Sequence, residues 1–382
     1  MGRTNDSKIR ILMVLGNTGR GGAQTYAMNV LRNIDRDRFH IDFAVNYVYE
    51  NGYTDEIQDS GSKIFTIPKF KGVNYFEYVK SFDKLLKEGH YDIVHGHVSS
   101  SASIYLKIAK RNGCTTVVHS HSAGYRGNAA EQLIKKFATR GARSQADYWF
   151  GCSRIAAERL FGPGFESSPK YHSIPNAIIT DRYLFDVDIR KQIRESLEIE
   201  DNVILYGHVG SFSAPKNHLF LLEVFRKIVD TKGDKVHLVL LGEGSLKNGI
   251  EAKVSQLGIR DQVTFSGNVG NVNEYLMGMD VMIFPSIFEG FPVTLLEAQA
   301  TGLFCLVSDS ITNEVNISEC IQPMSLNEGS EAWAIKAMEI PEIDRVSVNR
   351  TISLSLYNMD NSIKTLMNLY EEMCIKKRET NN

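Results

Sequence analysis

A lysine in the middle of the chain follows a glycine-containing turn, an arrangement that suits an anionic ligand. Gly210, Ser211 and Lys216 lie between an apolar run over residues 203–209 and a helical pattern over residues 219–229. A lysine at the start of a helix acts as a point charge on a phosphate, and the helix N-terminus adds a positive potential. A solvated surface lysine is the alternative, and this segment alone does not decide between the two.

Two glutamates eight positions apart form a second candidate group. Glu289 follows an apolar run over residues 281–284, and Gly290 beside it lets the backbone come close to a ligand. Glu297 lies in an apolar helical pattern, where a carboxylate needs a polar partner, and sugar hydroxyls are suitable partners. The amides of residues 290–294 suit an anion or a hydroxyl. The glycine, proline and apolar flanks favour a binding segment over two solvated acids.

A glycine-rich turn near the N-terminus, residues 16–24, precedes a helical pattern. Its glycines, Gly21 and Gly22 among them, let backbone amides approach a phosphate at the start of the helix. The turn lacks the third glycine of a dinucleotide fingerprint and the Lys-Ser or Lys-Thr of a P-loop. We predict contact with phosphate or sugar, and a plain strand-to-helix turn is the alternative.

Two His-x-His pairs end expected strands, at residues 95–97 and 119–121. Alternation along a strand puts residues i and i+2 on the same side, so each pair can converge on one ligand. Four histidines at strand ends leave a metal-dependent hydrolase open as a minority hypothesis. Core histidines bonded to the backbone are the alternative. We expect no metal, because the sequence has no further His or acidic cluster at a metal-ligand spacing.

The elements that must position these residues alternate between β-rich runs and helical patterns, which is typical of a parallel sheet. In the first half we expect strands at residues 9–15, 40–45, 63–67, 92–95, 115–119 and 147–152, and helices at 23–34, 75–88, 101–110 and 129–143. An X-Pro turn at residues 174–177 marks a boundary. The pattern then restarts with strands at 203–209, 236–241, 262–266, 281–284 and 304–308, and helices at 219–229, 246–257, 273–278 and 293–301.

This order predicts an α/β protein with two Rossmann-like, doubly wound domains that face a central cleft. We expect the domains at residues 1–177 and 178–355. Residues 356–382 are expected to form a C-terminal helix, packed back on the first domain, with a polar tail.

The composition is that of an ordinary globular protein, with 43% hydrophobic and 23% charged residues. Five scattered cysteines without a C-x-x-C pair exclude a disulfide framework and a zinc ribbon. No apolar run approaches the roughly 20 residues of a spanning helix, and we expect a cytoplasmic protein. Residues 1–182 carry 25 Lys and Arg against 17 Asp and Glu, whereas the remainder carries 18 against 28. The basic half suits an anionic ligand or membrane surface, and no motif indicates nucleic acid.

The run over residues 289–298, after a strand that ends in Phe284-Pro285-Ser286, resembles the signature of the retaining family-4 glycosyltransferases. Further matches follow in order at residues 21–24, 92–95, 118–119 and 174–176, at Gly210 with Lys216, and at residues 242–244. The resemblance covers residues 9–310, and the overall texture is similar to bacterial exopolysaccharide and capsule enzymes of the EpsF type. It implies the GT-B fold and transfer of a hexose, with retention, from a nucleotide sugar of the UDP type.

Carried over residue by residue, the resemblance implies three catalytic positions: His119, Lys216 and Glu289. Lys216 would neutralise the leaving diphosphate, Glu289 would face the transferred sugar, His119 would contact the donor sugar or the reacting centre, and Glu297 would bind ribose hydroxyls. The full set of implied donor-binding residues is Gly21, Gly22, Gly210, Ser211, Lys216, Gly242, Asn268, Val269, Glu289, Gly290, Phe291, Pro292, Val293 and Glu297. No cofactor and no essential metal are expected, because the cleft-forming segments contain no Asp-x-Asp motif.

Ser211 departs from the family, which usually has an arginine after this glycine. One cationic contact to the diphosphate is then missing, so either Arg20 or Arg126 substitutes for it or the donor binds more weakly. A catalytically silent nucleotide-sugar binder therefore stays open as an alternative, and so does a nucleotide-sugar epimerase, which would share the two-domain architecture but need no acceptor.

The basic N-terminal half is expected to hold the acceptor. Residues 131–143 interleave apolar residues with cations, as an interfacial helix does, and a packing helix with a solvated basic face is the alternative. The acceptor or membrane candidates are Arg126, Lys135, Lys136, Arg140 and Arg143. The expected partners are a nucleotide sugar, a glycan or lipid-diphosphate-linked acceptor, and an anionic membrane surface.

Overall fold

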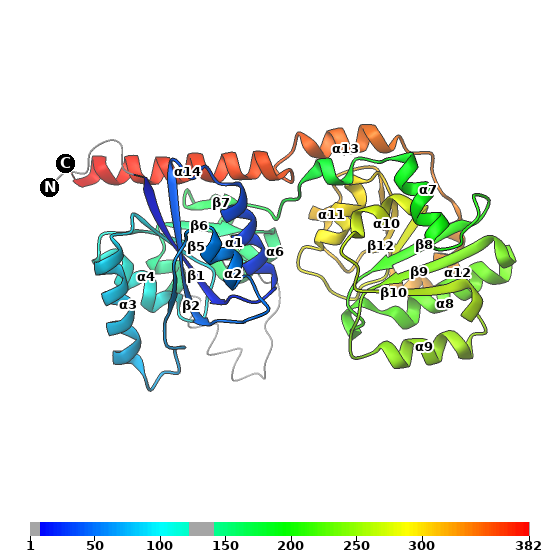
Figure 1. Cartoon of the computed structure of the whole chain (residues 1–382), viewed down its shortest axis with the longest axis horizontal. Helices are drawn as coiled ribbons and strands as arrows, with labels where there is room; N and C mark the ends of the chain where they lie inside the picture. The colour runs from blue at the N-terminus through cyan, green and yellow to red at the C-terminus, as the bar shows by residue number, and fades with distance from the viewer. Residues whose placement is uncertain (1–7, 122–140, 382) are drawn as a thin grey trace. The chain divides into compact units, whose positions relative to one another are not determined.

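The computed structural model describes residues 8–121 and 141–381, which divide into two compact units (Figure 1). The N-terminal unit comprises residues 1–176 together with 359–382, and the C-terminal unit comprises residues 177–358. Each unit is built on one parallel sheet with helices on both faces. The prediction of two doubly wound α/β domains is therefore confirmed. The unit boundaries fall after residues 176 and 358, where the sequence indicated 177 and 355.

The N-terminal sheet has seven strands in the order β3-β2-β1-β4-β5-β6-β7. These are β1 (Ile9–Asn17), β2 (Phe39–Tyr47), β3 (Ile64–Thr66), β4 (Ile93–Gly96), β5 (Thr115–Ser120), β6 (Tyr148–Gly151) and β7 (Tyr171–Ser173). All neighbours pair in parallel, with Ile11 of β1 opposite Ile41 on one side and Ile93 on the other. The strand order reverses between β1 and β4. Ligands of such sheets bind beyond the carboxyl ends of the strands at this switch point.

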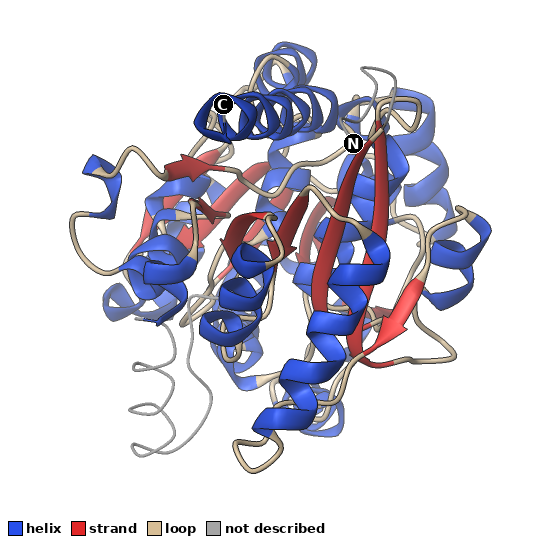
Figure 2. Cartoon of the chain, turned by 90° about the vertical axis from the view of Figure 1, so that its left-hand side faces the viewer, coloured by secondary structure: helices blue, strands red, loops and turns tan. Residues whose placement is uncertain are grey.

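Helices cover both faces of this sheet (Figure 2). One face packs against α3 (Tyr75–Gly89), α4 (Ala102–Arg111) and α6 (Arg154–Phe161) through a cluster that includes Val94 and Val118. His95 and His119 alternate with these valines and point to the other face, where α1 (Gly22–Asn33) and α14 (Met359–Asn381) lie. The short α2 (Thr54–Asp59) follows β2. The expected packing of the C-terminal helix on the first sheet brings Tyr370 into the N-terminal core.

The C-terminal sheet has six parallel strands in the order β10-β9-β8-β11-β12-β13. These are β8 (Ile204–Val209), β9 (Val236–Leu241), β10 (Val263–Gly267), β11 (Val281–Phe284), β12 (Phe304–Ser308) and β13 (Ile321–Met324). One face packs against α8 (His218–Lys232), α9 (Lys247–Gln256) and α12 (Gly329–Met338). The other packs against α10 (Val272–Gly278) and α11 (Val293–Ala300), with α7 (Val187–Ser196) on α10 and α13 (Arg345–Ser353) on α11. The switch point lies between β8 and β11.

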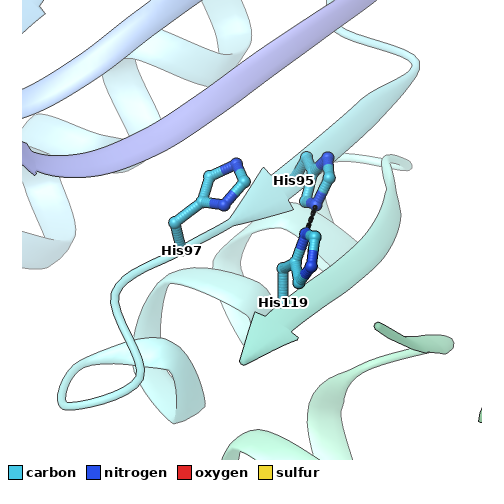
Figure 3. Close-up of side chains that lie close together, drawn as sticks. All are labelled: His95, His97 and His119. Carbon is cyan, nitrogen blue, oxygen red and sulfur yellow. Dashed lines mark hydrogen bonds between the residues drawn. The ribbon is translucent and has the colours of Figure 1, made fainter. Parts of the chain in front are cut away.

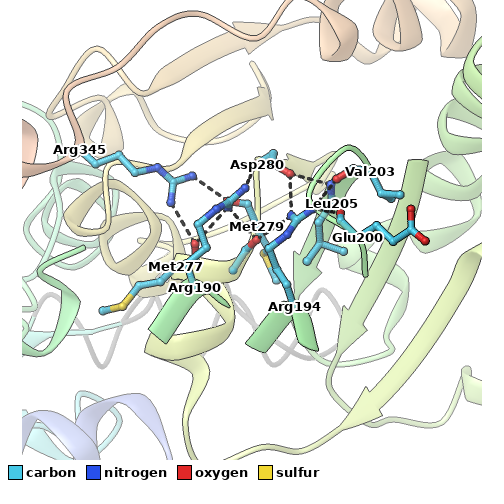
Figure 4. Close-up of polar contacts among 10 residues, drawn as sticks. Arg190, Arg194, Glu200, Val203, Leu205, Met277, Met279, Asp280 and Arg345 are labelled. Carbon is cyan, nitrogen blue, oxygen red and sulfur yellow. Dashed lines mark hydrogen bonds and ion pairs between the residues drawn. The ribbon is translucent and has the colours of Figure 1, made fainter. Parts of the chain in front are cut away.

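An arginine clamp, which consists of Arg190, Arg194, Asp280 and Arg345, holds the amino ends of these central strands (Figure 4). Asp280, just before β11, accepts hydrogen bonds from Arg190 Nη2 at 2.6 Å, Arg194 Nη1 at 3.1 Å and the Leu205 amide at 2.8 Å. Arg345 donates to backbone carbonyls at the C-terminal end of α10. The clamp thereby ties α7, α10 and α13 together at the sheet edge opposite the carboxyl ends.

The described residues 8–121 and 141–381 contain no helix that is both long and apolar enough to cross a membrane. The basic segment over residues 131–143 lies outside them except for its last residues. Arg126, Lys135, Lys136 and Arg140 therefore receive no structural account. Arg143 is described: its guanidinium lies 5.0 Å from the centre of the Trp149 ring and donates to the carbonyl of Phe161 at 2.6 Å. Part of its hydrogen-bonding capacity is thus used within the N-terminal unit.

Candidate active site

An ion pair joins the two loops that leave the switch point of the C-terminal sheet. Lys216 Nζ donates to Glu289 Oε1 at 2.6 Å, and 17% and 15% of these side chains are exposed. The loops also bond through Asn217 Nδ2 and the carbonyl of Pro285 at 3.2 Å. Lys216 Nζ lies 4.9 Å from the centre of the Phe284 ring, which favours a cation there. The structure therefore brings together two of the three residues assigned catalytic roles.

Two helices begin at this edge without a side-chain cap from the described residues. These are α8, which starts at His218, and α11, which starts at Val293 after Gly290, Phe291 and Pro292. Uncapped first-turn amides and the helix dipole together favour an anion or a hydroxyl. The Phe291 ring stacks on Tyr357, with centroids 5.6 Å apart, which fixes the chain before α11.

Glycines let the loops after β8 and β9 meet closely. Gly242 has φ +140°, and a Cβ there would stand 2.1 Å from the carbonyl oxygen of Gly210. At Gly210, a Cβ would come within 3.2 Å of both the Lys216 side chain and His208 Nε2. Ser211 is exposed, and its Oγ lies 3.0 Å from Ser213 Oγ, so the position after Gly210 supplies a hydroxyl and no charge.

The segment assigned to the nucleotide base follows β10. Asn268 is exposed, whereas Val269 is partly buried and packs against the core cluster of α10 and α11. Gly267 before them has φ +66°, a conformation that favours glycine. The backbone here is therefore sharply turned at the same carboxyl edge as the Lys216–Glu289 pair.

Glu297 has a protein partner that the sequence analysis missed. Its Oε1 accepts a hydrogen bond from the Tyr183 hydroxyl at 2.8 Å. Burial raises the pKa of Glu297, and the Tyr183 hydrogen bond opposes this by lowering it. Tyr183 therefore supplies one polar partner from within the protein, and contact of Glu297 with ribose hydroxyls stays a prediction.

Replacing Glu297 with glutamine is expected to stabilise the protein at neutral pH. Because folding raises the pKa of this carboxyl, the stability of the folded state falls as pH rises from 4.5 through the folded pKa, and the loss is complete above it. Glutamine has no charge to desolvate and still accepts from Tyr183. At pH 8, urea unfolding of Glu297→Gln should give up to about 1 kcal/mol more stability than wild type.

This gain should shrink as pH falls toward 4.5. Glu339→Gln is the matched control, because Glu339 is well exposed and pairs with Lys336 on the surface. A Glu297→Gln protein equally stable to wild type at pH 8, or one whose gain does not depend on pH, would contradict the burial argument.

Buried polar atoms without a hydrogen-bond partner gather at the carboxyl edges of both sheets. Nine such side-chain atoms occur among the described residues, and seven of them lie at these edges. In the C-terminal unit they are His208 Nε2, His218 Nδ1 and Nε2, and Ser286 Oγ; in the N-terminal unit they are Tyr26 Oη, His97 Nε2 and His119 Nε2. Unpaired buried polar groups are uncommon, so their concentration here indicates surfaces built to meet a polar ligand.

The four histidines of the two His-x-His pairs lie together in the N-terminal unit. Figure 3 draws three of them, with His95 Nε2 and His119 Nδ1 3.2 Å apart. His97 Nδ1 and His121 Nε2 are 2.7 Å apart, and Tyr26 of α1 lies edge-on to His119 at 4.7 Å. Burial lowers the pKa of His95 and of His121 to about 3, and it lowers those of His97 and His119 well below the usual value. The cluster is therefore neutral at physiological pH.

The structure gives one observation in favour of the minority metal hypothesis and two against it. His95, His97 and His119 each offer a ring nitrogen, and these atoms lie within 4.8 Å of one another. No carboxylate or thiol among the described residues completes this group. His95 and His119 also already bond to each other. His97 bonds to His121 as well, so hydrogen bonds within the protein engage all three possible ligands.

The glycine-rich turn ends at Gly21, the residue before α1, which also lacks a side-chain cap from the described residues. Space is open where a Cβ of Gly22 would stand, and both glycines are exposed. The guanidinium of Arg20, one of the two substitutes considered for the missing arginine, lies 5.4 Å from the centre of the Tyr53 ring. The turn therefore offers accessible amides at the start of α1, the helix whose Tyr26 contacts the histidine cluster.

Residues missed by sequence reasoning share one property: their partners are distant in the chain. His208 stands two positions before Gly210, the same strand-end spacing that singled out the His-x-His pairs, so a local signal existed for it. Tyr183 and Tyr370 carry no such signal, because they meet Glu297 and His95 from 114 and 275 positions away.

Comparison with known proteins agrees with this geometry. Residues 20–182 match the model of Glycosyltransferase Family 4, and residues 189–319 match that of Glycosyl transferases group 1. EpsF of Bacillus subtilis (strain 168), which is named as a glycosyltransferase, is 29% identical over 96% of this chain and 97% of its own length. The UDP-Gal:alpha-D-GlcNAc-diphosphoundecaprenol alpha-1,3-galactosyltransferase of Escherichia coli is 24% identical over 84% of this chain and 83% of its own length.

The crystal structure of a glycosyltransferase from Rickettsia africae ESF-5 has the same fold, with a TM-score of 0.78 and 15% identity over 96% of this chain and 98% of that one. Both sheets, their switch points and the two consecutive model matches agree on one family. The chain therefore belongs to the GT-B glycosyltransferases that join a family 4 N-terminal domain to a group 1 C-terminal domain.

Proposed function

We propose that this enzyme transfers a hexose from a UDP-sugar, with retention and without an essential metal, to a lipid-linked or oligosaccharide acceptor in the synthesis of a bacterial surface polysaccharide. The observation that carries the proposal is the Lys216–Glu289 pair, which lies at the C-terminal switch point between two uncapped helix N-termini. The Escherichia coli relative is named for a UDP-sugar donor and a diphosphoundecaprenol-linked acceptor, which supports both substrate classes.

The chemistry asked of the protein is stabilisation of the leaving nucleoside diphosphate. Lys216 and the first-turn amides of α8 and α11 bind the negative charge that grows on the phosphate oxygens as the glycosidic C–O bond breaks. The Lys216 ammonium keeps one N–H on Glu289 and has further N–H donors for the phosphate, while Glu289 faces the sugar. In front-face attack the acceptor oxygen bonds to the anomeric carbon on the side the phosphate leaves, and the acceptor proton passes to a departing phosphate oxygen. No carboxylate nucleophile is then required.

The acceptor is assigned to the N-terminal unit, whose sequence carries the excess of positive charge. An anionic lipid carrier or an anionic membrane surface at the cytoplasmic side suits that charge. Flotation with vesicles tests this part: the protein should rise with vesicles that contain phosphatidylglycerol and stay behind with neutral ones. Equal behaviour with both would remove the membrane surface from the proposal.

A donor panel tests the proposal itself. With EDTA present, UDP-glucose, UDP-galactose, UDP-N-acetylglucosamine and GDP-mannose are compared for their effect on the melting temperature. One UDP-sugar should stabilise the protein selectively, because a ligand that binds the folded state adds RT ln(1 + [L]/Kd) to its stability. At 100 Kd this is about 2.7 kcal/mol, which a melting curve resolves.

The same panel separates the alternatives. Stabilisation by zinc in the absence of EDTA, with no response to any sugar nucleotide, would favour the metal-dependent hydrolase over the transferase. Donor binding with neither transfer nor release of UDP identifies a silent binder. Conversion of the sugar without an acceptor identifies an epimerase. Lys253→Ala is a suitable control for donor binding, because Lys253 pairs with Glu223 between α9 and α8.

A further inference from the structure

A chain of hydrogen bonds in the N-terminal unit connects α14 with the carboxyl ends of β4 and β5. Tyr370 Oη lies 2.6 Å from His95 Nδ1, and His95 Nε2 lies 3.2 Å from His119 Nδ1. All three side chains are buried, with at most 1% exposed. We propose that Tyr370, acting through His95, fixes the tautomer of His119 so that Nε2 of His119 carries the proton and serves as a hydrogen-bond donor.

Counting protons shows which atom donates in each of these hydrogen bonds. Tyr370 has one O–H, and among the described residues its hydrogen-bond partner is His95. If that hydroxyl does not donate to His95 Nδ1, a buried donor stays unpaired, which costs about 1–3 kcal/mol. A neutral imidazole has one N–H. His95 accepts at Nδ1 and so carries its proton on Nε2, which donates to His119 Nδ1. His119 then carries its own proton on Nε2.

The opposite direction of donation leaves a buried O–H without an acceptor. If His119 Nδ1 donated to His95 and His95 donated to Tyr370 Oη, the tyrosine O–H would have no acceptor among the described residues. Burial keeps both rings neutral by lowering their pKa values, so a doubly protonated ring does not erase the direction. The carbonyl of Ile174 raises the pKa of His119, as an acceptor beside a ring N–H does, although no atom meets hydrogen-bond geometry at Nε2.

The tautomer decides what His119 can do. An N–H at Nε2 donates to an oxygen, and it cannot accept a proton from a hydroxyl. Under the proposed function, on which this step rests, His119 orients an oxygen of the transferred sugar and is not the base that deprotonates the acceptor. Tyr370 and His95 are positioning residues. Helix α14 thereby sets the tautomer of His119 through the hydroxyl of Tyr370.

The test reads the tautomer directly and needs no substrate. Protein labelled with ¹⁵N at its ten histidines is examined by two-bond ¹H–¹⁵N correlation, and the His119 signals are those missing from His119→Gln. In wild type, His119 should show a protonated Nε2 and an unprotonated Nδ1. In Tyr370→Phe, which removes the O–H alone, the proton of His119 should divide between Nδ1 and Nε2.

Two further variants separate direction from packing. His95→Gln can still accept from Tyr370 through Oε1 and donate to His119 through Nε2, so His119 should keep its wild-type tautomer. Tyr78→Phe is the matched control, because the Tyr78 hydroxyl is also buried but bonds to Ser101 at 3.2 Å. A proton on Nδ1 of His119 in wild type, or an unchanged His119 spectrum in Tyr370→Phe, would overturn the inference.

An activity measurement then connects the tautomer with the reaction. Once a donor has been identified, Tyr370→Phe should lower kcat about tenfold, whereas His95→Gln, in which Tyr370 is intact, should keep most of the wild-type kcat. Absence of transfer by wild-type protein would count against the proposed function and leave the tautomer result standing. The two failures are therefore distinguishable.

Discussion

Lys216→Ala is expected to lower kcat/KM by roughly 10²–10³-fold, the loss typical of removing one preorganised donor from a developing negative charge. Lys216 Nζ is held 2.6 Å from Glu289 and over the Phe284 ring, so it needs no reorganisation when a diphosphate arrives. Because only 17% and 15% of the two side chains are exposed, Glu289 loses a largely buried counter-charge, so some loss of stability is also expected and urea unfolding measures it separately from the rate. The measurement combines initial rates with the sugar nucleotide from the donor panel and urea unfolding of the same protein.

The matched controls distinguish a catalytic charge from a structural one. Lys253→Ala also breaks an ion pair in the C-terminal unit, but between α9 and α8, and should keep the wild-type rate. Glu289→Gln keeps a hydrogen-bond acceptor for Lys216, so the lysine stays in place while the charge facing the sugar is lost. A Lys216→Ala rate within twofold of wild type would remove Lys216 from the mechanism.

The sheets were predictable because the strands beside the sites are short, apolar and bounded by turns. The expected strands at 236–241, 281–284 and 304–308 coincide with β9, β11 and β12. The missed elements lack such a period. In α7 the buried residues are Ile193 and Arg194 within a charged segment, and β7 has three residues. Edge strand β13 contains Pro323, which the pattern of a central strand excludes.

The individual residues of the candidate site were predictable from the sequence, but the contacts between them were not. Turns after strands identified Lys216 and Glu289 separately, and their contact depends on β8 lying next to β11, which the sequence order does not reveal. Alternation correctly put His95 beside His97, with ring centroids 4.3 Å apart. The bond between His95 and His119 again required neighbouring strands, β4 and β5. Long-range hydroxyls such as that of Tyr370 lie beyond any local pattern.

Asp280→Asn is expected to destabilise the C-terminal unit by roughly 3 kcal/mol, the largest effect on folding that we predict. Arg194 has 3% of its side chain exposed, and Asp280 is the carboxylate that balances its charge and that of Arg190 among the described residues. An amide keeps the shape, but its NH2 group replaces one accepting oxygen and faces a donor of Arg190, or those of Arg194 and Leu205, so the change removes the charge and one acceptor together. Arginine does not lose its proton, and a buried guanidinium without a counter-charge is costly.

The two tryptophans make this measurement specific, because Trp149 lies in the N-terminal unit and Trp333 in the C-terminal unit. In a Trp149→Phe background, fluorescence during urea unfolding reports the C-terminal unit through Trp333, which is fully buried and bonded to the Ser325 carbonyl at 2.8 Å. Asp230→Asn is the control, since Asp230 pairs with Arg226 on the exposed face of α8 and should cost about 0.5 kcal/mol or less. A loss below about 1 kcal/mol for Asp280→Asn would mean that the carbonyls at the end of α10 suffice to hold the three arginines. The clamp would then owe its stability to the helix terminus, because the macrodipole places partial negative charge there.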